Sequence, residues 1–185
     1  MAWGMYIDPG KHFHAIALFS ESVLGSVYFQ PADSNPYGDG VLNVSSLVIE
    51  KPQIYPGADE KNPNDILEVY GAARFAEGII RARGGPAAHY VLPREWKGSF
   101  KKPPHHRQVW AALTPPEKAA FAECAGHSVD FIGEKIEAAC QRLARTREVS
   151  GYSWKAHNLL DAVGLGLWHH RRLRGRVAPP PIAKV

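Results

Sequence analysis

Residues 3–19 read WGMYIDPGKHFHAIALF, and this stretch decides the fold because a turn separates two apolar runs. Trp3–Ile7 predicts a β-strand. Asp8-Pro9-Gly10 predicts a turn, since proline fixes φ and glycine accepts a positive φ. Residues 12–19 predict a second strand and Val23–Phe29 a third, so the chain is expected to begin as an antiparallel meander. The first strand ends on a carboxylate, Asp8.

A parallel strand pair is predicted further along the chain. Leu47-Val48-Ile49 is an apolar run that ends on Glu50, a helix is expected from Asn62 to about Arg83, and a short strand from Tyr90 to Leu92. A strand–helix–strand unit of this kind predicts a parallel crossover. Further helices are expected over about 105–113, 115–125, 130–147 and 156–174. The pattern predicts a mixed α/β fold with one domain over residues 1–176 and a proline-rich tail over 177–185.

The net charge of +4 on 185 residues conceals an uneven distribution. Segment 94–107 carries five Lys and Arg against one acid, and segment 168–185 carries five with no acid. The rest of the chain therefore carries a net charge of −5. Two basic patches on an acidic body favour a polyanionic partner, although a solvated basic face is the simpler alternative.

The composition is that of an ordinary globular protein, with 45% hydrophobic and 22% charged residues. No apolar run approaches the roughly 18–20 residues of a membrane span, and no secretory signal is visible. Cys124 and Cys140 lie in no disulfide or CxxC pattern, which predicts buried thiols in a reducing compartment such as the cytoplasm.

Three acids stand where apolar neighbours make an isolated charge costly: Asp8 and Glu50 at strand ends, and Asp161 inside the run LLDAVGL. Each has a simpler interpretation, since Asp8 can cap a turn, Glu50 can pair with Lys51 or Lys97, and Asp161 can face solvent. Together they predict a cation site, because converging carboxylates repel one another and Mg²⁺ prefers oxygen ligands.

These segments resemble the RuvC-type Holliday junction resolvases. Residues 7–10 (IDPG) resemble the opening of that family, 48–52 (VIEKP) its second acid, and 159–167 (LLDAVGLGL) its closing helix. Gly71–Gly78 is similar to the helix after the second acid, and 93–107 to the basic segment of phage-type relatives. The resemblance spans about residues 3–172.

The resemblance implies an RNase H-like fold with a mixed five-stranded sheet flanked by helices, acting as a homodimer in the bacterial cytoplasm, in a phage-like member of the family. It implies an Mg²⁺-dependent endonuclease that resolves four-way junctions in DNA recombination and repair. Two Mg²⁺ ions, or Mn²⁺ in their place, would be held by Asp8, Glu50 and Asp161. A flap nuclease of broader specificity and a non-catalytic branched-DNA-binding module remain open. An actin-like phosphotransferase would need further glycine-rich phosphate loops and about twice this length.

The resemblance is imperfect at one position. Family members carry a fourth ligand, Asp or His, three residues before the last acid, where this chain has Asn158, with His157 one residue earlier. Both positions share the helix face of Asp161. Because imidazole can bind a metal or act as a base, His157 is the preferred fourth ligand and catalytic residue over Asn158. A helix-capping role for His157 is the alternative.

Several basic and aromatic residues are DNA-contact candidates. Lys97 is also implied by the resemblance to touch the scissile phosphate. Tyr55 follows Glu50 in a loop, where relatives place an aromatic wedge, although packing explains a loop tyrosine equally well. His105 and His106 could be metal ligands, but adjacent histidines point different ways on a helix, so they are expected to be solvated or to face phosphate. The DNA-binding set is Tyr55, Lys97, Lys101, Lys102, Arg107, Arg171 and Arg172.

Overall fold

The computed structural model describes residues 2–37, 43–53, 62–98, 101–147, 156–175 and 177–180. The strands are β1 (Trp3–Asp8), β2 (Phe13–Ser20), β3 (Val23–Pro31), β4 (Val44–Glu50) and β5 (His89–Val91). The helices are α1 (Pro63–Ala82), α2 (Pro93–Trp96), α3 (Lys102–Ala112), α4 (Pro115–Ala125), α5 (Val129–Thr146) and α6 (His157–His169). The predicted elements are all present, and the single turn α2 is an addition to them.

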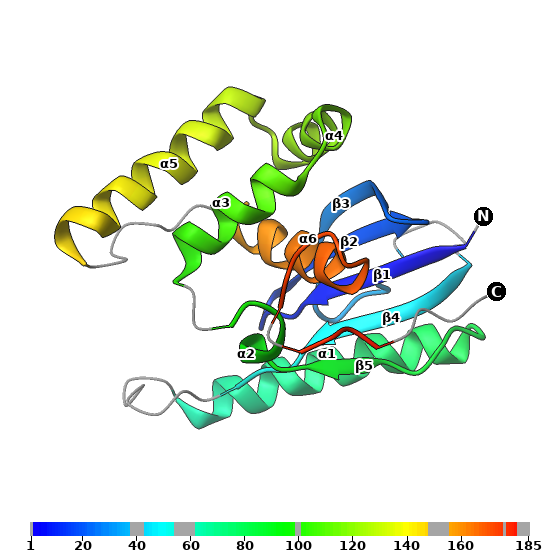
Figure 1. Ribbon diagram of the computed structural model, residues 1–185. Helices are drawn as coiled ribbons and strands as arrows, with labels where there is room; N and C mark the ends of the chain where they lie inside the picture. The colour runs from blue at the N-terminus through cyan, green and yellow to red at the C-terminus, as the bar shows by residue number, and fades with distance from the viewer. Residues whose placement is uncertain are drawn as a thin grey trace.

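The five strands form one sheet in the order β3-β2-β1-β4-β5. β1 pairs with β2 antiparallel and with β4 parallel, and β5 is parallel to β4. The predicted antiparallel meander and parallel crossover are both confirmed. The fold class is therefore the predicted α/β class, with a mixed five-stranded sheet flanked by helices (Figure 1).

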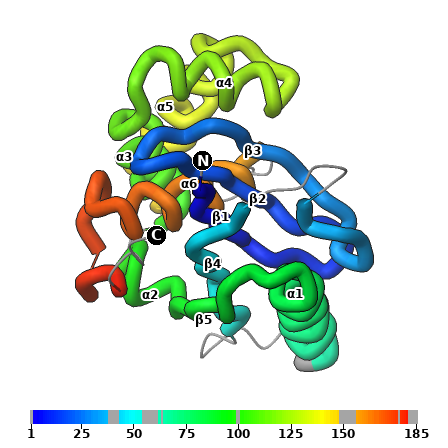
Figure 2. Tube along the Cα trace, turned by 90° about the vertical axis from the view of Figure 1, so that its right-hand side faces the viewer, coloured from blue at the N-terminus to red at the C-terminus, as the bar shows by residue number. Residues whose placement is uncertain are grey.

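Helices cover both faces of the sheet, as Figures 1 and 2 show. Successive residues of a strand point to opposite faces, so Met5 and Ile7 pack with Ala76 and Ile80 of α1. Tyr6 points the other way, into the core that β1 and β2 form with α6. Helices α3, α4 and α5 lie on this second side, and α3 packs against α6.

Helix α6 carries two glycines where aromatic rings of its neighbours leave no room for a side chain. A Cβ on Gly166 would stand 2.3 Å from the Phe19 ring, and one on Gly164 would stand 2.8 Å from the Trp96 ring. Neither position therefore accepts a larger side chain without displacing an aromatic ring. This close approach brings Asp161, one turn before Gly164, down onto the end of the sheet.

The start of α1 follows from its sequence. Asn62 caps the helix by accepting a hydrogen bond from the Asn64 amide at 3.0 Å, and Pro63 occupies the first turn, where its missing N–H is not needed. After Arg83 the chain turns at Gly84, whose φ of +83° suits glycine. The predicted limits of this helix, Asn62 and about Arg83, are confirmed.

Two predictions about the chain are corrected. The last helix ends at His169 rather than 174, because the Arg172 amide turns back to the Leu167 carbonyl at 2.8 Å and Arg171 adopts a left-handed φ of 59°. Cys140 is buried as predicted, but Cys124 is exposed. In the described parts of the chain, no helix is both long and apolar enough to cross a membrane.

Candidate active site

Two of the three predicted acids meet at one edge of the sheet. Asp8 and Glu50 are the last residues of β1 and β4, which run parallel as neighbours with Ile7 opposite Ile49. Asp161 approaches them from the second turn of α6. All three line one cavity of about 250 Å³, together with Gln53, Lys97 and Lys102 and with apolar residues that include Ile66 and Val69 of α1. The convergence that the sequence predicted is present.

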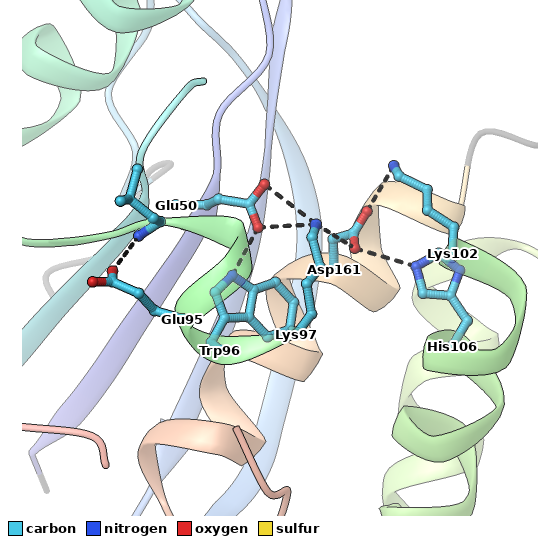
Figure 3. A network of polar contacts seen from close by, with 8 residues as sticks. Glu50, Glu95, Trp96, Lys97, Lys102, His106 and Asp161 are labelled. Carbon is cyan, nitrogen blue, oxygen red and sulfur yellow. Dashed lines mark hydrogen bonds and ion pairs between the residues drawn. The ribbon is translucent and has the colours of Figure 1, made fainter. Parts of the chain in front are cut away.

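The turn after β5 carries two of the site's polar side chains. Pro93 begins the single turn α2, and Glu95 accepts a hydrogen bond from the Leu92 amide at 2.7 Å. The Lys97 amide closes the turn on the Pro93 carbonyl at 2.9 Å. The turn thereby presents Trp96 and Lys97 to the carboxylates, as Figure 3 shows.

Glu50 is held by both of these residues. The Trp96 indole Nε1 donates to Glu50 Oε2 at 2.8 Å, and Lys97 Nζ lies 3.1 Å from the same oxygen. Lys97 Nζ also lies 3.3 Å from Asp161 Oδ1, so one ammonium joins the carboxylates of β4 and α6. The simpler alternative for Glu50, a pair with Lys97, is thus part of the site itself.

Asp161 has two more partners, both from α3. Lys102 Nζ lies 2.8 Å from Oδ2, and His106 Nε2 lies 3.3 Å from Oδ1 (Figure 3). The Asp161 side chain is only 1% exposed, so solvent does not compensate its charge. The alternative that Asp161 faces solvent is wrong.

The acids differ in their electrostatic surroundings. Burial, and then the charges of Glu50 and Asp161, raise the pKa of Asp8 well above its usual range. Burial also raises the pKa of Glu50, against the opposing effect of Lys97. For Asp161 burial acts in the same direction, but Lys97, His106 and Lys102 outweigh it and hold its pKa well below the usual range. Carboxylates with opposed pKa shifts in one cleft are typical of a functional site.

The donor set suits a divalent cation, although ammonium groups take the cation's place in this arrangement. No group of three His, Cys, Asp or Glu in the described ranges is arranged to hold a metal ion. Instead, Lys97 and Lys102 approach the carboxylate oxygens at 2.8–3.4 Å. Two ammonium groups lie among the three acids, of which Asp161 is buried and Asp8 and Glu50 are partly buried, so the cluster attracts positive charge. Oxygen ligands of this kind are those that Mg²⁺ prefers.

The two predicted fourth-ligand candidates begin α6. His157 is its first residue and Asn158 its second, and both are partly buried. The centroid of the His157 ring lies 6.3 Å from that of His106. His106 Nε2 lies 3.3 Å from Asp161 Oδ1, so the structure brings to the site a histidine that was expected to be solvated or to face phosphate.

The expectation for His105 and His106 is wrong, because both are buried. His105 packs edge-on against Trp96, with ring centroids 4.9 Å apart, and burial lowers its pKa to about 3. His106 is inside the acid cluster. The sequence held one sign of this position. His106 follows Lys102 by four residues, so the two share a face of α3 and can both reach Asp161.

Six of the seven predicted DNA-binding residues divide into three groups. Lys97 and Lys102 lie in the acid cluster. Lys101, Arg107 and Arg171 are exposed, with Lys101 Nζ 2.7 Å from the Arg147 carbonyl and Arg107 3.6 Å from Glu137. Tyr55 lies outside the described residues.

Arg172 requires a correction. Its guanidinium donates to both carboxylate oxygens of buried Glu117 and to the carbonyls of Ser22 and Ala112 at 2.7 Å. These bonds fasten the segment after α6 to α4 and to the β2–β3 turn. Arg172 is therefore a structural residue, and its donors are not free for a DNA phosphate.

Among the comparisons with known proteins, the one with solved structures gives matches. No family model matches the chain, and no curated protein matches it. Among solved structures, T. thermophilus RuvC in complex with a Holliday junction substrate is similar, with a TM-score of 0.45, 13% identity, and coverage of 91% of this chain and 92% of that one.

Proposed function

We propose that this protein is a divalent-cation-dependent endonuclease that hydrolyses phosphodiester bonds in branched DNA and resolves four-way junctions. One observation carries the proposal: Asp8, Glu50 and Asp161, from three separate elements, line a single cavity together with Lys97. Carboxylates that converge at the end of a sheet repel one another, and their burial is costly unless ammonium groups or a bound cation compensate it. A cluster of this composition suits the binding of divalent cations.

Asp8, Glu50 and Asp161 would hold Mg²⁺ or Mn²⁺, two ions per site. When bound, such ions lower the pKa of water to give a nucleophile and stabilise the leaving 3′ oxygen. Lys97 would contact the scissile phosphate, and its position in the cavity beside Glu50 and Asp161 supports this role. The Trp96 indole fixes the orientation of Glu50 by its 2.8 Å hydrogen bond.

The basic surface supplies the sequence-independent part of DNA binding. Lys101, Arg107 and Arg171 are exposed and would neutralise backbone phosphates, so binding should weaken steeply as salt rises. Arg94 and Arg174 are exposed in the same two basic segments. Tyr55 stays a proposed wedge residue.

We also propose a homodimer, because a four-way junction presents two equivalent strands for paired nicks. Helix α1 is the proposed interface, since it exposes Leu67, Tyr70 and Phe75. A symmetric pair of apolar helix faces is a common form of isologous contact. Sedimentation of the wild type and of L67E measures this: a dimer that becomes a monomer in L67E supports the interface.

The test is incubation of a four-way junction, a flap and a linear duplex with Mg²⁺ and with EDTA. Symmetric nicks near the junction centre, present in Mg²⁺ and absent in EDTA, are expected. Preferential cutting of the flap would indicate the broader-specificity nuclease, and binding without cutting the non-catalytic module. An Asp8→Asn protein that cuts as well as the wild type would end the proposal.

A further inference from the structure

The two lysines of the acid cluster are held in different ways. Lys97 is enclosed: its side chain is 13% exposed, it joins Glu50 and Asp161, and its ammonium lies 4.9 Å from the centroid of the Trp96 ring. Lys102 reaches Asp161 from the solvent side, with a side chain that is 42% exposed. Of the two ammonium groups, that of Lys102 has the open path out of the cluster.

The contact of Lys102 is also the shorter one. Its Nζ lies 2.8 Å from Asp161 Oδ2, whereas Lys97 and His106 both address Oδ1, at 3.3 Å. Both oxygens of Asp161 therefore already face a donor. A divalent cation that binds Oδ2 must therefore share this oxygen with the Lys102 ammonium or displace it, and repulsion between the two positive charges favours displacement.

We propose that Lys102 is a built-in competitor for the divalent cation: it occupies Asp161 Oδ2 while the site is free and moves to a DNA phosphate when the cation binds. This inference rests on the proposed function, which supplies the cation and the DNA. The consequence is that cation binding and DNA binding assist each other, because the cation binds the Asp161 carboxylate and a DNA phosphate binds the Lys102 ammonium that the cation displaces. Such a coupling is reciprocal by thermodynamic necessity.

The first test measures Mn²⁺ binding to the DNA-free protein by titration calorimetry. Removal of a competing ammonium should raise the affinity for Mn²⁺ rather than lower it. Lys102→Met should therefore bind Mn²⁺ about tenfold more tightly than the wild type, and Lys102→Arg should bind it as the wild type does. Lys101→Met is the matched control, because it removes the same charge one residue away and its Nζ contacts the Arg147 carbonyl instead. It should change Mn²⁺ affinity less than twofold.

The outcomes separate this inference from the proposed function. If Asp161→Asn abolishes Mn²⁺ binding while Lys102→Met binds as the wild type does or more weakly, the function stands and the competitor role is wrong. If neither the wild type nor Lys102→Met binds Mn²⁺ at millimolar concentration, both fall. Lys102→Gln replaces Lys102→Met if the melting curve of the methionine variant shows that it is unfolded.

The second test measures junction affinity in Ca²⁺ and in EDTA by fluorescence anisotropy. In EDTA Lys102 is engaged with Asp161, so Lys102→Met should bind the junction as the wild type does. In Ca²⁺ the freed ammonium contributes a phosphate contact, and the variant should bind at least threefold more weakly. An equal loss in both conditions would overturn the displacement.

Discussion

Arg172 and Glu117 form a bidentate ion pair between the segment after α6 and the first turn of α4, with Nη2 of the arginine 2.7 Å from Oε2 of the glutamate. Glu117 Oε2 also accepts from the Thr114 amide at 2.8 Å, which caps α4, and Oε1 accepts from the Leu24 amide at 2.8 Å. One carboxylate thus joins three parts of the chain. Breaking the pair leaves a buried charge without its counterion.

The first prediction follows from that geometry. Arg172→Met should lower the free energy of unfolding by about 3 kcal/mol, because removal of one partner uncovers the buried carboxylate of the other. Urea denaturation at pH 7 measures it. Arg171→Met is the control, since Arg171 is exposed, and it should change the free energy by less than about 0.5 kcal/mol. A loss as small in Arg172→Met as in Arg171→Met would contradict the structural role assigned here.

The second prediction concerns acid stability. Burial alone would raise the pKa of Glu117, but its bonds with Arg172, Leu24 and Thr114 lower it from 4.5 to about 2. A carboxyl with a depressed folded-state pKa stabilises the protein above its unfolded pKa and loses that contribution as pH falls. The stability difference between wild type and Glu117→Gln should therefore be constant above pH 5 and shrink between pH 4.5 and about 2.

Denaturation curves at several pH values measure this difference. The size expected at neutral pH is about 3 kcal/mol. A difference that does not change between pH 6 and pH 3 would contradict the depressed pKa.

The acid cluster and the Glu50–Lys97 pair could be predicted from the sequence, and the partners that α3 supplies could not. Asp8 and Glu50 each end an apolar run, and the parallel crossover makes neighbours of the two strands, so local pattern and topology together imply their convergence. Asp161 is recognisable because apolar residues surround it. The partners depend on tertiary packing: Lys102 and His106 reach Asp161 only because α3 packs on α6.

In the two basic segments, too, the sequence does not show which side chains form ion pairs within the fold. Composition counts charges, but it does not show which are already paired. Lys97, Lys102 and Arg172 belong to the two basic segments, yet each is engaged with an acid inside the fold. Arg172 pairs with a residue 55 positions away, on a helix whose own sequence gives no sign of the contact. The surface open to a polyanion is correspondingly smaller than the sequence indicates.

The third prediction is that neutralising Asp8 stabilises the folded protein, whereas neutralising Asp161 destabilises it. The raised pKa of Asp8 means that its charge destabilises the folded protein once the pH exceeds its unfolded-state pKa. Asp8→Asn should therefore be more stable than the wild type at pH 8 by about 1–2 kcal/mol, as is common for functional-site carboxylates. Asp161 has a lowered pKa and several cationic partners, so Asp161→Asn should be less stable.

Thermal melting of both variants in EDTA at pH 8 and at pH 4 measures this prediction. The gain in Asp8→Asn should diminish at the lower pH, where the wild-type carboxyl becomes protonated. Both variants should bind a junction and fail to cut it. Two variants that shift the melting temperature in the same direction would contradict the electrostatic assignment.

The fourth prediction separates the two histidines near Asp161. His157→Ala, the change at the preferred fourth-ligand position, should abolish cleavage and leave junction binding intact. His106 holds Asp161 Oδ1 from α3, and loss of such an orienting contact typically costs 10–100-fold, so His106→Ala should slow cleavage by about that factor. His106→Gln retains a donor near the Nε2 position and should recover part of the rate.

Single-turnover cleavage of a four-way junction, with each variant's junction affinity and Mn²⁺ affinity measured alongside, decides between them. If His106 had only a structural role, His106→Ala and His106→Gln would both lose stability and cleavage rate, and His106→Gln would recover no part of the rate. Near-normal turnover in His157→Ala would remove His157 from the site. Combined with a large loss in His106→Ala, it would show that α3 rather than the start of α6 supplies the imidazole, because His106 Nε2 lies 3.3 Å from Asp161 Oδ1.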